Sequence, residues 1–163
     1  IYVACLPSYN NGILHGAWID ACQDKDEIIG EVQAMLAASS IEDAEEWAIH
    51  DYEGFKGISL SEYEGFERVA ELASFIEEHG ELGTKVYEHF SNLDDALNAL
   101  DDHYCGRFDS VADFAAEITS ETTEIPERLA YYIDYDRMAS DMEINDIFVI
   151  KTCHGEHHVF WIF

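Results

Sequence analysis

The sequence carries a formal net charge of −27 in 163 residues, and its acidic residues are spread from one end to the other. The net charge is −10 for residues 1–55, −9 for residues 56–110 and −8 for residues 111–163. An acidic tail therefore does not account for the charge, which is a property of the whole surface. Repulsion among so many negative charges disfavours folding. We therefore infer that the negative electric field of the surface serves the protein's function.

The composition nevertheless predicts a folded chain, since 48% of the residues are hydrophobic, 13% are aromatic and only 2 are proline. The length fits one domain or two to three small modules. Because the chain has only 8 lysines and arginines, we expect it to bind neither nucleic acid nor anionic membranes. Its expected partners are proteins with basic surfaces. No apolar run reaches the length of a membrane span, and no signal peptide opens the chain. Because the sequence begins at Ile1 rather than at methionine, we expect leading residues to be missing.

We predict an α+β fold of three modules, and residues 1–60 form the first, a small α+β module. Its helix has Ile28, Val32, Met35 and Leu36 on one stripe, with acidic residues in the first turn. The expected elements are a strand over 1–6, a turn cluster over 7–12, an apolar run to residue 19, a helix over 24–37 and a strand over 46–52.

The central module, residues 61–103, has a helical pattern with a break at His79–Gly80. The expected helices cover residues 61–78, 82–90 and 93–102, the last opened by a capping box from Ser91 to Asp94.

The third module, residues 104–163, is again predicted to be α+β. A second capping box runs from Ser110 to Asp113, and Pro126 stands where the first turn of another helix is expected. Strands are expected over residues 147–152 and 158–163, around a turn at 154–156.

The predicted helix over 61–78 shows how acidic residues coexist with a core. At 100° per residue, its four glutamates fall within about 60° of one another around the helix axis; they are Glu64, Glu67, Glu71 and Glu78. Their successive steps along the axis are roughly 4.5, 6 and 10.5 Å. Val69, Leu72, Ala73 and Ile76 take the opposite side, while Phe75 falls close to the acids. Duplex DNA carries one charge per about 1.7 Å, so 27 charges match roughly 46 Å of duplex. The candidate DNA-mimicking surface comprises Asp24, Glu27, Glu31, Glu64, Glu67, Glu71, Glu78, Asp94, Asp95, Asp101, Asp102, Asp113 and Glu117.

Other functions remain open at this point. A single acidic face can be merely solvated, and the chain can be a generic acidic module that binds a basic protein. A halophilic enzyme is also acidic and poor in lysine, although such proteins usually contain few large apolar residues. No segment fits the calcium loop of an EF-hand. No catalytic or phosphate-binding motif is present, so we expect no enzyme and no cofactor.

The cysteines and histidines are expected to be structural. The four cysteines form no C-x-x-C pair and are predicted to be buried, reduced thiols of a cytoplasmic protein. His15 and His50 are expected in the core or at a strand edge. The cluster over 153–158 contains cysteine and histidine, but alternating residues of a hairpin point to opposite faces, so we predict a hairpin there rather than a metal site.

Three segments of the sequence resemble the ArdA-type antirestriction proteins of plasmids and conjugative transposons. They lie near the start, at one third and near the end of the chain, so the resemblance spans nearly its whole length. The segments are YNNGILHGAWID at 9–20, EWAIHDYE at 46–53 and LAYYIDY at 129–135, the last continuing through Met138 and 141–143 to Phe148.

This resemblance implies an elongated protein of three modules that mimics B-form DNA inside a bacterial host cell. Members of the family dimerise through the C-terminal module and occupy the DNA-binding groove of type I restriction–modification enzymes. They thereby block restriction and modification. The tyrosine-rich segment corresponds to the family's antirestriction motif near the dimer contact, which assigns that role to Tyr132, Ile133, Asp134, Tyr135, Met138 and Asp141. No catalytic group, cofactor or metal is implied, and we expect the aromatic residues to supply the core.

Overall fold

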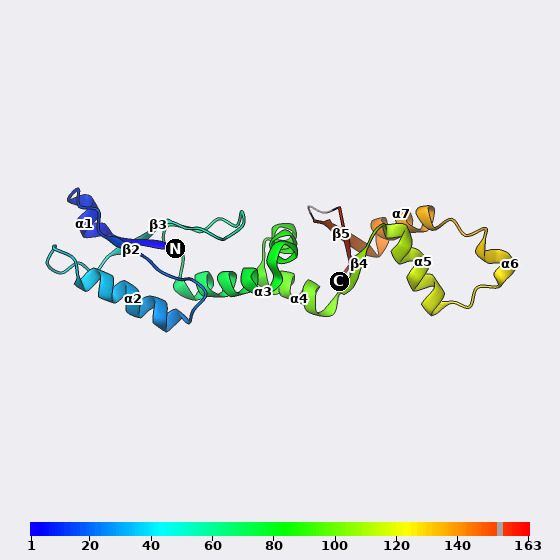
Figure 1. The fold of residues 1–163 in the computed structure, drawn as a ribbon, viewed down its shortest axis with the longest axis horizontal. Helices are drawn as coiled ribbons and strands as arrows, with labels where there is room; N and C mark the ends of the chain where they lie inside the picture. Colours follow the sequence, from blue (N-terminus) through cyan, green and yellow to red (C-terminus); the bar gives the residue numbers. More distant parts are fainter. Residues whose placement is uncertain (153–154) are drawn as a thin grey trace. The chain divides into compact units, whose positions relative to one another are not determined.

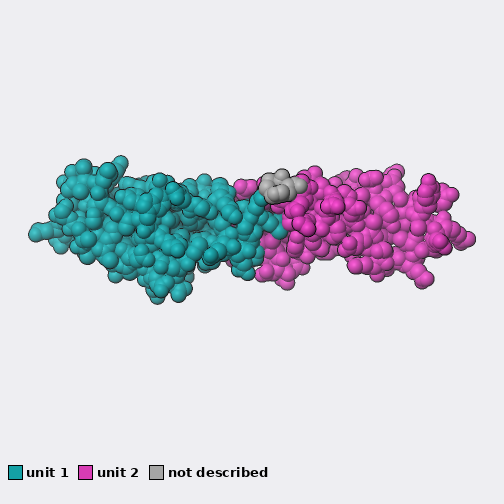
Figure 2. Space-filling view, in the orientation of Figure 1, with its two compact units in different colours: residues 1–84 teal, residues 85–163 magenta. Residues whose placement is uncertain are grey.

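The computed structural model describes residues 1–152 and 155–163 and shows helices together with small antiparallel sheets (Figure 1). The predicted α+β class is therefore confirmed. The chain divides into two compact units, residues 1–84 and residues 85–163, which are coloured separately in Figure 2. The finer division into modules at 1–60, 61–103 and 104–163 stays a prediction.

The first unit is built on a three-stranded sheet whose central strand is the first in sequence. Its order is β2-β1-β3 with both pairings antiparallel, and it comprises β1 (Tyr2–Cys5), β2 (Gly16–Trp18) and β3 (Trp47–Asp51). Helix α2 (Lys25–Ala37) packs against β1 and β2 (Figure 1). Its residues Ile28, Val32 and Met35 are buried, which confirms the predicted stripe for these three, while Leu36 is half-buried.

The segment after β1 differs from its prediction. Residues expected to form a turn cluster instead form a short helix, α1 (Leu6–Asn10), with Pro7 in its first turn. Proline suits this position because its fixed φ is helical and its missing N–H would have no partner there. The turn follows at Asn11 and Gly12, and Gly12 has a φ of +75°.

Helix α3 (Phe66–Phe90) contains the predicted break. Gly80 has φ 59° and ψ −135°, a conformation that glycine adopts without the strain that a Cβ would impose. The helix begins at Phe66 rather than at residue 61, and the expected separate helix over 82–90 is its continuation after the kink. Val69, Leu72, Ala73 and Ile76 are buried as predicted. Phe75, which the helical period places close to the acids, is buried too.

The second unit contains a sheet whose central strand is the last in sequence. Its antiparallel order is β4-β6-β5, with β4 (Tyr104–Phe108), β5 (Ile147–Lys151) and β6 (His157–Trp161). Strands β5 and β6 confirm the two predicted strands, whereas β4 was not predicted. The helices are α4 (Leu93–Asp102), α5 (Val111–Thr122), α6 (Glu127–Ala130) and α7 (Tyr135–Asn145). One cluster of buried core residues comprises Val111, Phe114, Ala115, Ala139, Ile147 and Val159.

The predicted caps are partly correct. The Ser110 hydroxyl accepts a hydrogen bond from the Asp113 N–H at 3.1 Å and begins α5, as expected. Helix α4, however, is capped by Asn92, whose side chain accepts from the Asp94 N–H at 2.8 Å. Ser91 has a φ of 56° and belongs to the turn before the cap. Pro126 is the residue directly before α6 rather than inside its first turn.

The cysteines and histidines follow their predictions only in part. Cys5 is buried, Cys105 is half-buried and Cys22 is exposed, so the expectation of buried thiols is wrong for Cys22. His15 Nε2 lies 2.7 Å from the Met35 carbonyl oxygen, and His50 lies on the edge strand β3, as expected.

Two kinds of feature are absent from the described residues. Neither range, 1–152 or 155–163, contains a helix long and apolar enough to cross a membrane. The same ranges hold no group of three or more histidine, cysteine, aspartate or glutamate side chains placed to bind a metal. Cys153 and His154 of the predicted hairpin cluster lie outside the described residues.

Candidate functional site

The acidic side chains lie on the surface of both units. Every aspartate and glutamate is exposed except Glu64, Glu81 and Glu156, which are half-buried. Twelve of the thirteen candidate residues are accordingly exposed, and the exception is Glu64. Since 35 acids stand against 8 lysines and arginines, one-to-one pairing would leave most carboxylates without a basic partner. The outward field of both units is therefore negative.

The first unit brings four candidate acids together, although they come from two helices. Asp24 and Glu27 lie at the start of α2, while Glu67 and Glu71 lie on α3, and all four line a hollow of about 700 Å³. We call these four residues and the space that they line the acidic hollow. The Lys25 ammonium also lines it and forms an ion pair with Glu67 at 3.3 Å. Asp26 and Glu27 in the first turn of α2 complement the positive end of that helix.

The predicted line of four glutamates along one helix is shorter than expected. Glu64 precedes α3, and its carboxylate accepts a hydrogen bond from the Ser61 N–H at 3.3 Å. Glu67, Glu71 and Glu78 do lie on α3, at axial steps of about 6 and 10.5 Å for a regular helix. The α3 row therefore contains three candidate carboxylates.

Candidate acids of the second unit occupy both ends of α4 and the first turn and middle of α5. Asp94 and Asp95 lie in the first turn of α4, where the helix dipole favours them. Asp101 and Asp102 end the same helix, where the dipole disfavours negative charge. On α5, the Ser110 hydroxyl donates to the Asp113 carboxylate at 2.6 Å, while Glu117 is exposed one turn later.

Residues of the proposed antirestriction motif lie on α7 and in the turn before it. Tyr132 is 80% exposed and packs edge-on against Tyr131, which is 90% exposed. The Asp134 carboxylate accepts from the Arg137 N–H at 3.0 Å and begins α7. Within the motif, Ile133 and Tyr135 are half-buried, whereas Tyr132, Asp134, Met138 and Asp141 are exposed.

The aromatic residues divide by type, which corrects the expectation that they supply the core. Phenylalanine supplies much of it, since Phe55, Phe66, Phe75, Phe114 and Phe160 are buried. Several tyrosines and tryptophans are instead exposed among the carboxylates: Tyr9, Trp18, Tyr63, Tyr104, Tyr131, Tyr132 and Trp161.

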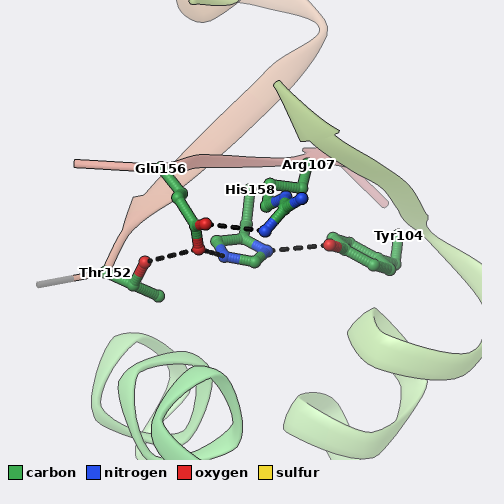
Figure 3. A network of polar contacts seen from close by, with 5 residues as sticks. All are labelled: Tyr104, Arg107, Thr152, Glu156 and His158. Carbon is green, nitrogen blue, oxygen red and sulfur yellow. Dashed lines mark hydrogen bonds and ion pairs between the residues drawn. The ribbon is translucent and has the colours of Figure 1, made fainter. Parts of the chain in front are cut away.

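A polar network in the second unit was not predicted (Figure 3). His158 on the central strand β6 is 8% exposed, and its Nδ1 lies 2.7 Å from the Tyr104 hydroxyl. Glu156 lies 3.8 Å from His158 Nε2 and receives a hydrogen bond from Arg107 at 2.6 Å. Burial raises the pKa of Tyr104, although the nearby Arg107 acts in the opposite direction. These contacts join β4 to β6 and to Glu156 directly before it, so we regard the network as structural.

Residues 1–156 match the model of the antirestriction protein family ArdA. The chain belongs to the ArdA family of antirestriction proteins. This match covers all three segments on which the resemblance was based, and it confirms the family assignment. Among curated proteins, none matches the chain.

Membership in the ArdA family assigns the protein an antirestriction function and implies that it interacts with restriction–modification enzymes. Its acidic surface was predicted from composition alone. The acidic hollow was missed because helical periodicity orders residues along one helix and says nothing of which helix lies beside it. No sequence signal identified the Tyr104–His158 contact, whose partners are 54 residues apart.

Proposed function

We propose that this ArdA protein inhibits type I restriction–modification enzymes by imitating B-form DNA in their DNA-binding groove. The observation that carries the proposal is that almost all of its 35 acidic side chains are exposed, on both units. A groove that binds duplex DNA is lined by lysine and arginine, which neutralise phosphates. Carboxylates held on helices offer such a groove fixed negative charges without a nucleic acid.

The geometry of the helices supports this imitation. Carboxylates one turn apart on a helix are separated by about 6 Å along its axis. Phosphates along one DNA strand are about 3.4 Å apart per nucleotide, so this step is close to the separation of two nucleotides. The proposed activity uses no catalytic group, metal or cofactor, and the protein acts as an inhibitor rather than as an enzyme. It is proposed to act as a homodimer that forms through the second unit near Tyr132 to Asp141.

A competition assay tests the proposal. A labelled duplex containing the recognition site is bound to a type I modification methyltransferase, and purified ArdA protein is added at increasing concentration. We expect release of the duplex, and weaker competition as salt is raised, because exposed charges are screened more strongly. Undiminished DNA binding in a large excess of folded protein would refute the proposal for that enzyme. A duplex of neutral-backbone analogue, which lacks phosphate charge, serves as the control that should not compete.

A further inference from the structure

A small hollow in the first unit combines aromatic side chains with carboxylates. It has a volume of about 420 Å³ and is lined by Leu6, Glu45, Glu46, Trp47 and Tyr63. We call it the aromatic hollow. Both glutamates are exposed and Tyr63 is 65% exposed, so the lining groups are accessible from solvent. Neither lysine nor arginine is among the lining residues.

The backbone around the aromatic hollow is held by the sheet. The Leu6 N–H donates to the Glu46 carbonyl at 3.0 Å, directly beside the Cys5–Trp47 pair of β1 and β3. The Trp47 ring stacks on buried Phe66 with centroids 4.1 Å apart and an angle of 24° between the rings. One face of the indole is thereby covered, and the side chain still lines the hollow.

Tyr63 reaches the hollow from the segment that follows β3. The Ile49 N–H donates to the Glu62 carbonyl at 2.8 Å, which fixes this segment against the edge strand. The Tyr63 N–H donates to the Ser61 hydroxyl at 3.4 Å within the same turn. Both aromatic side chains are therefore attached to ordered backbone, so little freedom is lost when a ligand binds.

We propose that the aromatic hollow binds an arginine side chain of the restriction–modification enzyme, a contact that rests on the function proposed above. A guanidinium group is planar, stacks on aromatic faces and forms paired hydrogen bonds with carboxylates. Trp47 and Tyr63 supply the rings, while Glu45 and Glu46 supply the carboxylates. Duplex DNA offers phosphates to the enzyme but no aromatic ring beside paired carboxylates. The site therefore adds affinity for the enzyme that duplex DNA does not have.

Charge and chemistry favour arginine over other occupants. A second copy of this chain carries a net charge of −27 and is repelled from a site that bears two exposed glutamates. An apolar side chain would leave the carboxylates of Glu45 and Glu46 without a partner. Lysine would satisfy the charge, but its compact ammonium cannot bind both carboxylates and stack as a planar group.

Matched variants in the DNA competition assay test the site. We expect Tyr63→Ala to weaken competition by about 2- to 30-fold, the range that a cation–π contact provides, and Tyr63→Phe to keep it. Tyr9→Ala removes another exposed tyrosine of the same unit that does not line the hollow, and it should leave competition nearly unchanged. Circular dichroism of each variant checks that the fold is retained.

A second pair of variants separates this site from general charge. Glu45→Gln combined with Glu46→Gln should weaken competition about 5- to 10-fold more than Asp101→Asn combined with Asp102→Asn, which removes the same charge from α4. Equal losses in these two double variants, or equal affinity of Tyr63→Ala and Tyr9→Ala, would overturn the arginine site while leaving DNA mimicry intact. A wild-type protein that fails to compete would instead refute the proposed function, and the arginine site with it.

Discussion

Converting the four carboxylates of the acidic hollow to amides tests whether inhibition is distributed over the surface. The variant carries Asp24→Asn, Glu27→Gln, Glu67→Gln and Glu71→Gln, and its net charge is −23 because four acids of a −27 chain are neutralised. All four side chains are exposed, so their replacement removes charge without disturbing the core. The variant gives up the Lys25–Glu67 ion pair and the favourable place of Glu27 at the start of α2, while it also lowers self-repulsion, so its stability should stay close to that of the wild type.

The expected loss follows from the value of exposed ion pairs. Each such pair contributes about 0.2–1 kcal/mol, so a single neutralisation should weaken binding by about 1.4- to 5-fold. If four contributions add, they amount to about 0.8–4 kcal/mol, or about 4- to 800-fold. Lys25, which forms an ion pair with Glu67 at 3.3 Å, offers a control whose replacement should change the affinity in the opposite direction. Lys25→Gln should strengthen competition, because it removes a positive charge from the acidic hollow.

The assay is the displacement of a labelled duplex from a type I methyltransferase at fixed, moderate salt. The quadruple variant, the four single variants and Lys25→Gln are compared by their apparent dissociation constants. A quadruple variant on α4, with Asp94, Asp95, Asp101 and Asp102 all converted to asparagine, should lose a similar amount. The reasoning would be refuted by a folded single variant that abolishes competition, since that result requires one discrete site.

Three further predictions concern local structure. Asn92→Ala should lower the free energy of unfolding by about 1 kcal/mol in a denaturant titration, and Asn92→Asp should not, because only alanine lacks the cap acceptor. Partial shielding of the thiol from water, followed by the charges of Glu77 and Asp20, raises the pKa of Cys22, so its alkylation at pH 8 should be slow and Glu77→Gln should accelerate it; equal rates by peptide mapping would contradict this. Gly83→Ala should cost about 1–3 kcal/mol, since its Cβ would lie 2.4 Å from that of His79, and an unchanged melting temperature would exclude this clash.

The sequence predicted those elements whose formation depends on nearby residues. The stripe Ile28, Val32 and Met35 lies on one face of α2, and periodicity alone is enough to find it. The break in α3 was predictable because Gly80 interrupts a helical pattern. The cap at Ser110 was predictable for the same local reason.

Elements that depend on distant partners were not predictable. Strand β4 has the sequence YCGRF, in which glycine and arginine weaken the strand pattern, and it is held by pairing with β6 about fifty residues later. At the start of α4, Ser91 and Asn92 are both good caps, and the left-handed conformation at Ser91 decides in favour of Asn92.

The candidate site divides in the same way. That the acids are exposed follows from the cost of burying a charge, which holds wherever the chain places them. Which acids meet across α2 and α3, and that Glu64 precedes the helix, depends on packing and on the start of α3. Composition therefore predicts the sign of the surface, while tertiary packing determines its pattern.

The order of strands in the two sheets has a consequence for folding on the ribosome. In the first unit the central strand β1 is made first, so β2 and β3 can each pair with it as they emerge. In the second unit the central strand β6 ends at Trp161, 53 residues after β4 ends at Phe108. At about 5–20 residues per second, β4 waits roughly 3–11 s for its partner. A nascent chain should therefore resist protease over residues 1–84 while the second unit is still cleaved.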